Sequence, residues 1–98
     1  MAKTFRDLLE ETKASIREID VQTADHLRRE GGLLVDVREQ DEVDQGAVPG
    51  AIHIPRGYLE LQIEEKAPDR NRPIAVYCAG GTRSAFAARA LQDLGYTD

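Results

Sequence analysis

The chain has 98 residues, of which 41% are hydrophobic and 32% are charged, so the sequence predicts one globular domain. The formal net charge of −5 argues against nucleic acid as a partner, and no apolar run reaches the roughly 20 residues of a membrane span. Residues 1–13 lack the continuous apolar stretch of a secretory signal. With a single Cys, an internal disulfide is excluded, and we expect a reducing, cytoplasmic setting.

The first third of the sequence predicts two helices with a short strand between them. Apolar or semi-apolar side chains recur along residues 5–16 at the spacing of one helical face. Ile19 and Val21 alternate with polar residues, which predicts a short edge strand. Residues 23–32 predict a short helix that ends at two consecutive glycines.

Three apolar segments predict strands in the rest of the chain. Leu33–Val37 and Ile74–Cys78 are compact runs rich in β-branched residues, typical of parallel strands that are buried on both faces. Ala51–Ile54 predicts a third, short strand that stops at a proline. Helical segments are expected at residues 38–46 (a short acidic helix or turn), 57–68 and 84–95. This alternation favours an α/β fold in which ligands lie at the carboxyl ends of the strands.

The loop after Ile74–Cys78 reads Cys-Ala-Gly-Gly-Thr-Arg-Ser. Two glycines free the backbone to turn several N–H groups toward one centre, and the following helix adds the positive end of its dipole. Such a cradle favours a thiolate and lowers the pKa of Cys78. Arg83 offers a cationic fork to an oxyanion, and the hydroxyls of Thr82 and Ser84 can donate hydrogen bonds or cap the helix. The pattern favours an anion-handling nucleophile over a buried structural cysteine with a solvated arginine.

Other cysteine chemistries find less support. His26 and His53 are distant from Cys78 in the sequence, so a Cys-His dyad is not indicated. Without a second Cys there is no resolving thiol for a disulfide cycle. No Cys/His cluster has metal-ligand spacing, and the glycine patterns of dinucleotide or P-loop sites are absent. We therefore expect neither a metal nor a cofactor.

Two segments together resemble the rhodanese-type sulfurtransferase family. Leu33–Pro55, "LLVDVREQDEVDQGAVPGAIHIP", is similar to the family's Asp-Val-Arg-Glu segment and its Pro-Gly-Ala turn. Tyr77–Ser84, "YCAGGTRS", is similar to the active-site loop that begins with the catalytic cysteine. The resemblance implies a three-layer α/β/α fold around a central parallel sheet.

The resemblance also implies a reaction and its residues. Cys78 takes the outer sulfur of thiosulfate or a related donor as a persulfide, and a thiophilic acceptor such as cyanide, a thiol or a protein removes it. Arg83 holds the oxyanion of the donor, and Arg56 is a candidate for the pocket rim. Asp36 and Arg38 are expected to give structural support. Asp36 would brace backbone N–H groups, and Arg38 would pair with Glu39 or Glu42, with lining of the pocket as the alternative. The backbone of the loop binds the persulfide through Ala79, Gly80, Gly81, Thr82 and Ser84.

The same resemblance raises a question about the C-terminus. Family members usually continue past Gly95–Asp98 into a further strand and helix, and their five-stranded sheet has the order 1-5-4-2-3. We therefore expect residues 1–98 to be a single rhodanese-like domain that is truncated at its C-terminus or completed by another chain. The absent strand would leave two inner edges unpaired, which is an aggregation hazard.

Two other functions remain open. Dual-specificity phosphatases of the cell cycle share the superfold, but their loop has five residues between Cys and Arg, where this chain has four between Cys78 and Arg83. The shorter loop fits one sulfur atom better than a phosphoryl group. A non-enzymatic binding module is the second alternative, although such modules often lose the cysteine that is retained here.

Overall fold

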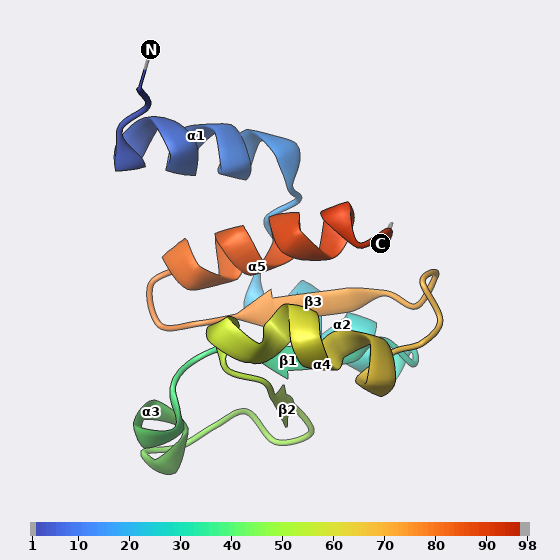
Figure 1. Ribbon diagram of the computed structural model, residues 1–98. Helices are drawn as coiled ribbons and strands as arrows, with labels where there is room; N and C mark the ends of the chain where they lie inside the picture. The colour runs from blue at the N-terminus through green and yellow to red at the C-terminus, as the bar shows by residue number, and fades with distance from the viewer. Residues whose placement is uncertain (1, 97–98) are drawn as a thin grey trace.

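Parallel strands flanked by helices form the fold of the computed structural model, which describes residues 2–96 (Figure 1). The elements in chain order are α1 (Phe5–Ser15), α2 (Val21–Arg29), β1 (Leu33–Asp36), α3 (Gln40–Asp44), β2 (Ile52–His53), the 3-10 helix η1 (Arg56–Tyr58), α4 (Leu59–Lys66), β3 (Ile74–Tyr77) and α5 (Thr82–Asp93). All three strands expected from the apolar runs at 33–37, 51–54 and 74–78 are present, each slightly shorter than predicted.

The sheet has the order β2-β1-β3, and both pairings are parallel. Val35 in the central strand lies opposite Ile52 on one side and Val76 on the other. Every residue of β1 is buried, as the unbroken apolar run predicts for a strand covered on both faces. Because the strands are parallel, their carboxyl ends meet at one edge, where Cys78 follows β3. Within residues 2–96, β3 pairs along one edge only.

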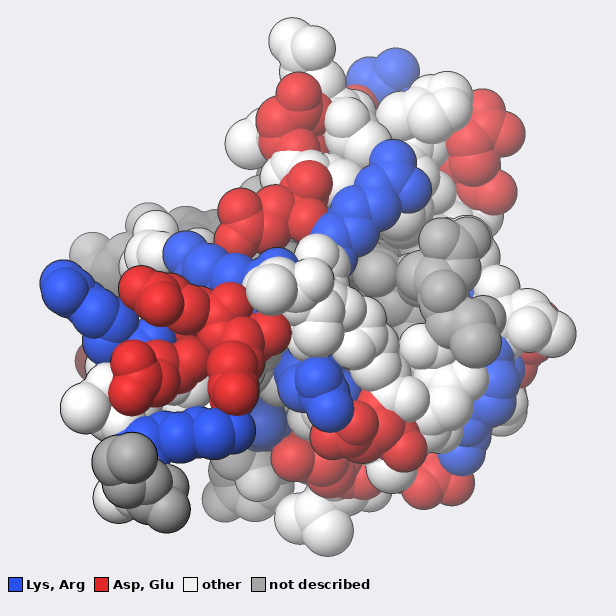
Figure 2. All heavy atoms as spheres, turned by 90° about the horizontal axis from the view of Figure 1, so that it is seen from above, with Lys and Arg blue, Asp and Glu red and all other residues white. Residues whose placement is uncertain are grey.

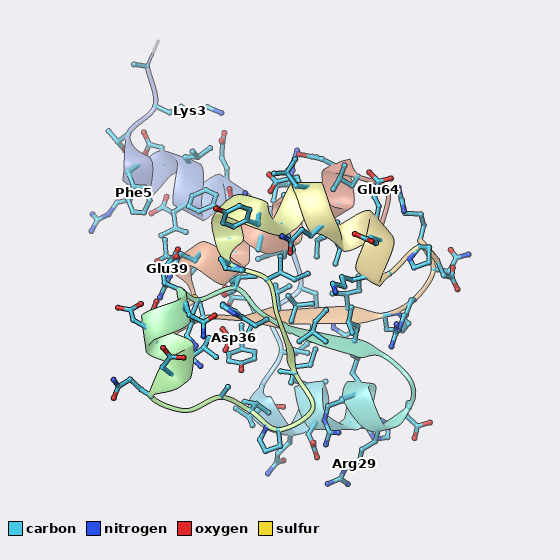
Figure 3. All side chains as sticks on the ribbon, turned by 60° about the horizontal axis from the view of Figure 1, so that its bottom comes forward. Lys3, Phe5, Arg29, Asp36, Glu39 and Glu64 are labelled. Atoms are coloured by element: carbon cyan, nitrogen blue, oxygen red, sulfur yellow. The ribbon has the colours of Figure 1, made fainter. Side chains whose placement is uncertain are left out.

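Helices cover the two faces of the sheet unequally. Helices α4 and α5 lie on one face and α2 lies on the other (Figures 1 and 3). The main core forms between the sheet and the α4–α5 pair, from Leu33, Val35, Val37, Ile54, Leu59, Ile63, Ala67, Ala87, Leu91 and Tyr96. This arrangement confirms the predicted three-layer α/β/α fold.

Helix α1 packs on the outer side of α5, away from the sheet (Figure 1). Its N-terminus is fixed by a capping box in which Asp7 N donates to Thr4 Oγ1 and Thr4 N donates to Asp7 Oδ2. The Phe5 ring lies 6.1 Å from the Phe86 ring, centroid to centroid. Helix α1 therefore adds a further layer without contributing to the strand-end edge where Cys78 lies.

The predicted edge strand at Ile19 and Val21 is wrong. Residues 17–20 have no regular structure, and Val21 is the first residue of α2. Asp20 is the N-cap, and its Oδ1 accepts a hydrogen bond from Thr23 N at 2.7 Å. A satisfied N-cap stabilises the helix start, and this outweighs an alternation of only two apolar residues.

Helix α5 begins at Thr82, two residues earlier than the apolar pattern predicts. Gly81 is its N-cap and has φ of 87°, a left-handed conformation that glycine adopts without steric cost. The early start places Arg83 and Ser84 in the first helical turn. Their backbone N–H groups are therefore among those left free at a helix N-terminus.

None of the helices in residues 2–96 is long and apolar enough to cross a membrane. On the face shown in Figure 2, acidic and basic side chains are interspersed.

Candidate active site

Cys78 lies directly after β3, at the mouth of the turn that leads into α5. Its Sγ accepts a hydrogen bond from Gly81 N at 3.1 Å and another from Ser84 N at 3.4 Å. The Oγ of Ser84 is 3.5 Å from the same sulfur. The two backbone contacts show that the turn folds N–H donors onto the sulfur, so the loop forms the cradle that its two glycines predict.

Two opposing effects set the pKa of Cys78. Burial of the sulfur raises it, because a charged thiolate loses hydration. Hydrogen bonds from the Ser84 side chain and from the backbone of Ser84, Gly81 and Gly80 lower it, and together they outweigh burial. The pKa of the Cys78 thiol is therefore below its ordinary value. A larger thiolate fraction at neutral pH makes the residue a better nucleophile.

Arg83 projects from the first turn of α5 and forms a two-pronged ion pair with Glu42 of α3. Its Nη1 contacts Oε1 of Glu42, and its Nη2 donates to Oε2 at 2.8 Å. The pKa of Arg83 is raised first by this pair and further by the nearby charge of Cys78. The guanidinium is therefore bound to a carboxylate, and its residue directly precedes Ser84, whose N–H donates to the Cys78 sulfur.

A groove of about 600 Å³ runs along the edge of β3 that pairs with no strand within residues 2–96. The strand forms one wall, residues 16–19, α2 and α5 form the others, and Cys78, Gly80 and Gly81 lie at one end. The sulfur is therefore reachable from this side. Neither of the two histidines contacts Cys78 in the part of the chain that the structure describes, and no cluster of three or more metal ligands forms there.

Residues 19–98 of the sequence match the model of the Rhodanese-like domain family. The match includes every strand and the whole cysteine loop, and it leaves out α1. The chain belongs to the rhodanese-like domain family.

Individual relatives agree with this assignment. The thiosulfate sulfurtransferase PspE of Escherichia coli is 38% identical over 63 residues, which are 64% of this chain and 61% of PspE. The chain therefore spans about three fifths of the length of this curated relative.

Solved rhodanese-fold structures align over more of the chain. Human single-domain sulfurtransferase TSTD1 superposes with a TM-score of 0.71 at 29% identity, covering 85% of each chain. A Rhodopseudomonas palustris protein of unknown function, described as a possible tyrosine phosphatase, superposes with a TM-score of 0.82 at 30% identity. It covers 100% of this chain and 82% of that one.

In this rhodanese-like domain, Asp36 and Arg38 pair with each other. The Asp36 carboxylate accepts from the backbone N of Arg38 at 2.9 Å and from its Nη2 at 2.8 Å. Arg38 was expected to give structural support by pairing with Glu39 or Glu42; it pairs with Asp36 instead. Figure 3 shows Asp36 near the centre of the domain, and Glu39 outside it at the start of α3.

The Asp36–Arg38 pair connects the segment before β2, which contains Gly46, to β3, the strand that precedes Cys78. Arg38 Nη2 also donates to Gly46 O at 2.8 Å, and its guanidinium lies over the Tyr77 ring, 5.6 Å from the centroid. The Tyr77 hydroxyl in turn accepts from Val48 N at 3.2 Å. Because Tyr77 directly precedes Cys78, this network supports the position of the sulfur.

The structure does not bring Arg56 to the loop. Its Nη1 donates to Oε1 of Glu60 at 2.7 Å, one helical turn away, and it lines a separate hollow beside α1. Of the remaining candidates, Ala79 is exposed, and Thr82 makes no side-chain hydrogen bond among the described residues. Glu42, which the sequence analysis considered only as a partner for Arg38, joins the site through Arg83.

The contribution of the Ser84 hydroxyl can be measured. We expect Ser84→Ala to raise the pKa of Cys78, because the thiolate loses a hydrogen-bond donor that the thiol form does not need. The rate of alkylation by iodoacetamide, followed against pH, should show its inflection at a higher pH than in the wild type. Ser84→Thr keeps a hydroxyl and should retain the wild-type inflection. Identical curves for all three proteins would show that the hydroxyl has no such role.

Proposed function

We propose that the domain is a sulfurtransferase that moves sulfane sulfur from thiosulfate or a related donor to a thiophilic acceptor such as cyanide or a thiol. The observation that carries the proposal is the Cys78 sulfur in its cradle, where Gly81 N and Ser84 N donate to it. The names of relatives such as thiosulfate sulfurtransferase PspE support this choice of chemistry.

In the first half-reaction, the Cys78 thiolate attacks the outer sulfur of thiosulfate. A bond forms between Sγ and that sulfur, the S–S bond of thiosulfate breaks, and sulfite leaves with the bonding electron pair. The product is a Cys78 persulfide, whose terminal sulfur an acceptor nucleophile then removes, which regenerates the thiolate. The backbone donors that lower the pKa of the thiol also stabilise a persulfide anion in the same loop.

A phosphatase remains the alternative that one observation favours, since the Rhodopseudomonas palustris neighbour is described as a possible tyrosine phosphatase. The two functions separate in one pair of assays, thiosulfate:cyanide transfer and hydrolysis of an aryl phosphate by the same preparation. We expect turnover in the first and none above background in the second. Aryl phosphate turnover without sulfur transfer would replace the sulfurtransferase proposal with the phosphatase.

Arg83 supplies the charge that holds an oxyanion of the donor. We expect Arg83→Ala to lower kcat/KM for thiosulfate by about 10- to 100-fold, because a charge-assisted hydrogen bond is lost and Glu42 is left without its partner. An alkyl persulfide, which has no sulfonate oxygens, should lose clearly less. Equal losses with both donors would contradict a role for Arg83 in recognising the oxyanion.

A further inference from the structure

Arg83, the cation in the first turn of α5 that follows the cysteine loop, already forms an ion pair. Both of its terminal nitrogens bind the two carboxylate oxygens of Glu42, which lies 41 positions away in the sequence. Such a two-pronged pair is the strongest geometry between arginine and a carboxylate. A donor oxyanion that seeks the guanidinium must therefore compete with Glu42.

Glu42 is fixed in this position by its own helix. Its Oε1 accepts a hydrogen bond from Glu39 N at 3.1 Å, closing a capping box at the start of α3. Its side chain is about one-third exposed. The Arg83 hydrogen bonds, followed by that of Glu39 N, lower the pKa of Glu42 to about 2. The carboxylate is therefore charged at any pH at which the Cys78 thiolate reacts.

Glu42 offsets the positive charge of Arg83. Arg38 is neutralised in the same way by its ion pair with Asp36. Among the charged residues that line the groove with Cys78, Lys13 pairs with Glu18, and Arg17 adds one positive charge. A donor with two negative charges is therefore attracted less than it would be by an unpaired Arg83 guanidinium, whereas a donor with one or none loses little.

We propose that Glu42 is a positioning residue that acts through Arg83 to set the donor preference of the domain, favouring alkyl persulfides over thiosulfate. The inference rests on the proposed sulfurtransferase function. The thiolate attacks the terminal sulfur of R–S–SH, the new bond joins Sγ to that sulfur, and the old S–S bond breaks. The alkyl thiolate R–S⁻ leaves with the electron pair, and the persulfide proton stays on the transferred sulfur. The exchange is redox-neutral and needs no co-reactant.

The test compares two donors in two variants of matched charge. In the wild type, we expect kcat/KM for an alkyl persulfide with an uncharged alkyl group to exceed that for thiosulfate by about tenfold or more, since this donor carries at most one negative charge. Glu42→Gln should raise kcat/KM for thiosulfate by about tenfold, mainly through KM, and leave the persulfide within about twofold. Asp41→Asn removes the same charge from an exposed position on the same helix and should change neither donor.

Ionic strength gives a readout that a purely structural role would not move. In Glu42→Gln, the thiosulfate rate should fall with added salt more steeply than in the wild type, because an unpaired guanidinium attracts the dianion over a longer range. A wild type that prefers thiosulfate, an unchanged donor ratio in Glu42→Gln, or an equal gain in Asp41→Asn would each overturn the proposal. Failure of both donors to load sulfur on Cys78 would refute the proposed function instead.

Discussion

The Cys78→Ser variant is expected to lose sulfur transfer from thiosulfate to cyanide, with kcat/KM lower by at least about a thousandfold. A serine hydroxyl is almost entirely protonated at neutral pH and cannot form the S–S bond that carries the transferred sulfur. The cradle itself should survive, because Gly81 N and Ser84 N can donate to an oxygen as well as to a sulfur. The loss is therefore one of chemistry and not of fold.

Two measurements keep this result interpretable. Thermal unfolding of Cys78→Ser should match the wild type within a few degrees, since the side chain is only half-buried. The transfer assay should be repeated after iodoacetamide treatment of the wild type, which blocks the same sulfur without a substitution. Transfer that persists above one tenth of the wild-type rate in both cases would mean that another group accepts the sulfur.

The second large effect is on stability. Asp36→Asn should lower the free energy of unfolding by about 3 kcal/mol, because it leaves the largely buried Arg38 guanidinium without its counter-charge. Asp36 is 1% exposed, so water cannot replace the lost carboxylate. Urea unfolding measures the change. Asp41→Asn, at an exposed position, should stay within about 0.5 kcal/mol of the wild type.

The pH dependence of this difference has a definite sign. Burial raises the pKa of Asp36, but hydrogen bonds from Arg38 outweigh it, so the pKa is lowered in the folded protein. A lowered pKa means that the carboxylate contributes its full stability above the pKa of the unfolded chain and loses it as the pH falls through the folded pKa. The difference in the free energy of unfolding between the wild type and Asp36→Asn should therefore become smaller as the pH falls. A gap that is absent at neutral pH, or that widens in acid, would contradict the role given to the ion pair.

The elements closest to the site could be predicted from the sequence. The apolar runs at 33–37 and 74–78 are long enough, and rich enough in β-branched residues, to indicate buried parallel strands. The two glycines after Cys78 predict a turn with convergent N–H groups, and the structure contains it. These predictions rest on local properties of the chain, which sequence patterns encode directly.

The partners of the charged side chains could not be predicted in the same way. Glu42 and Arg83 are 41 positions apart and meet only because β1 and β3 are parallel neighbours whose following segments, α3 and α5, share one edge. Arg38 had several acidic residues nearby in the sequence, and only the geometry selects Asp36. For Arg56 the sequence predicted a place at the pocket rim, because the residue follows the segment that resembles the family. In the structure Arg56 pairs with Glu60, away from the cysteine loop.

The central claim is that Cys78 accepts a sulfur atom from a small donor. The most direct test is the intact mass of the folded chain after incubation with thiosulfate and removal of the donor, followed by identification of the modified peptide. We predict a gain of one sulfur atom on the peptide that contains Cys78, which disappears on addition of cyanide and never forms in Cys78→Ser. Folded wild-type protein whose mass stays unchanged with thiosulfate and with an alkyl persulfide would contradict the claim.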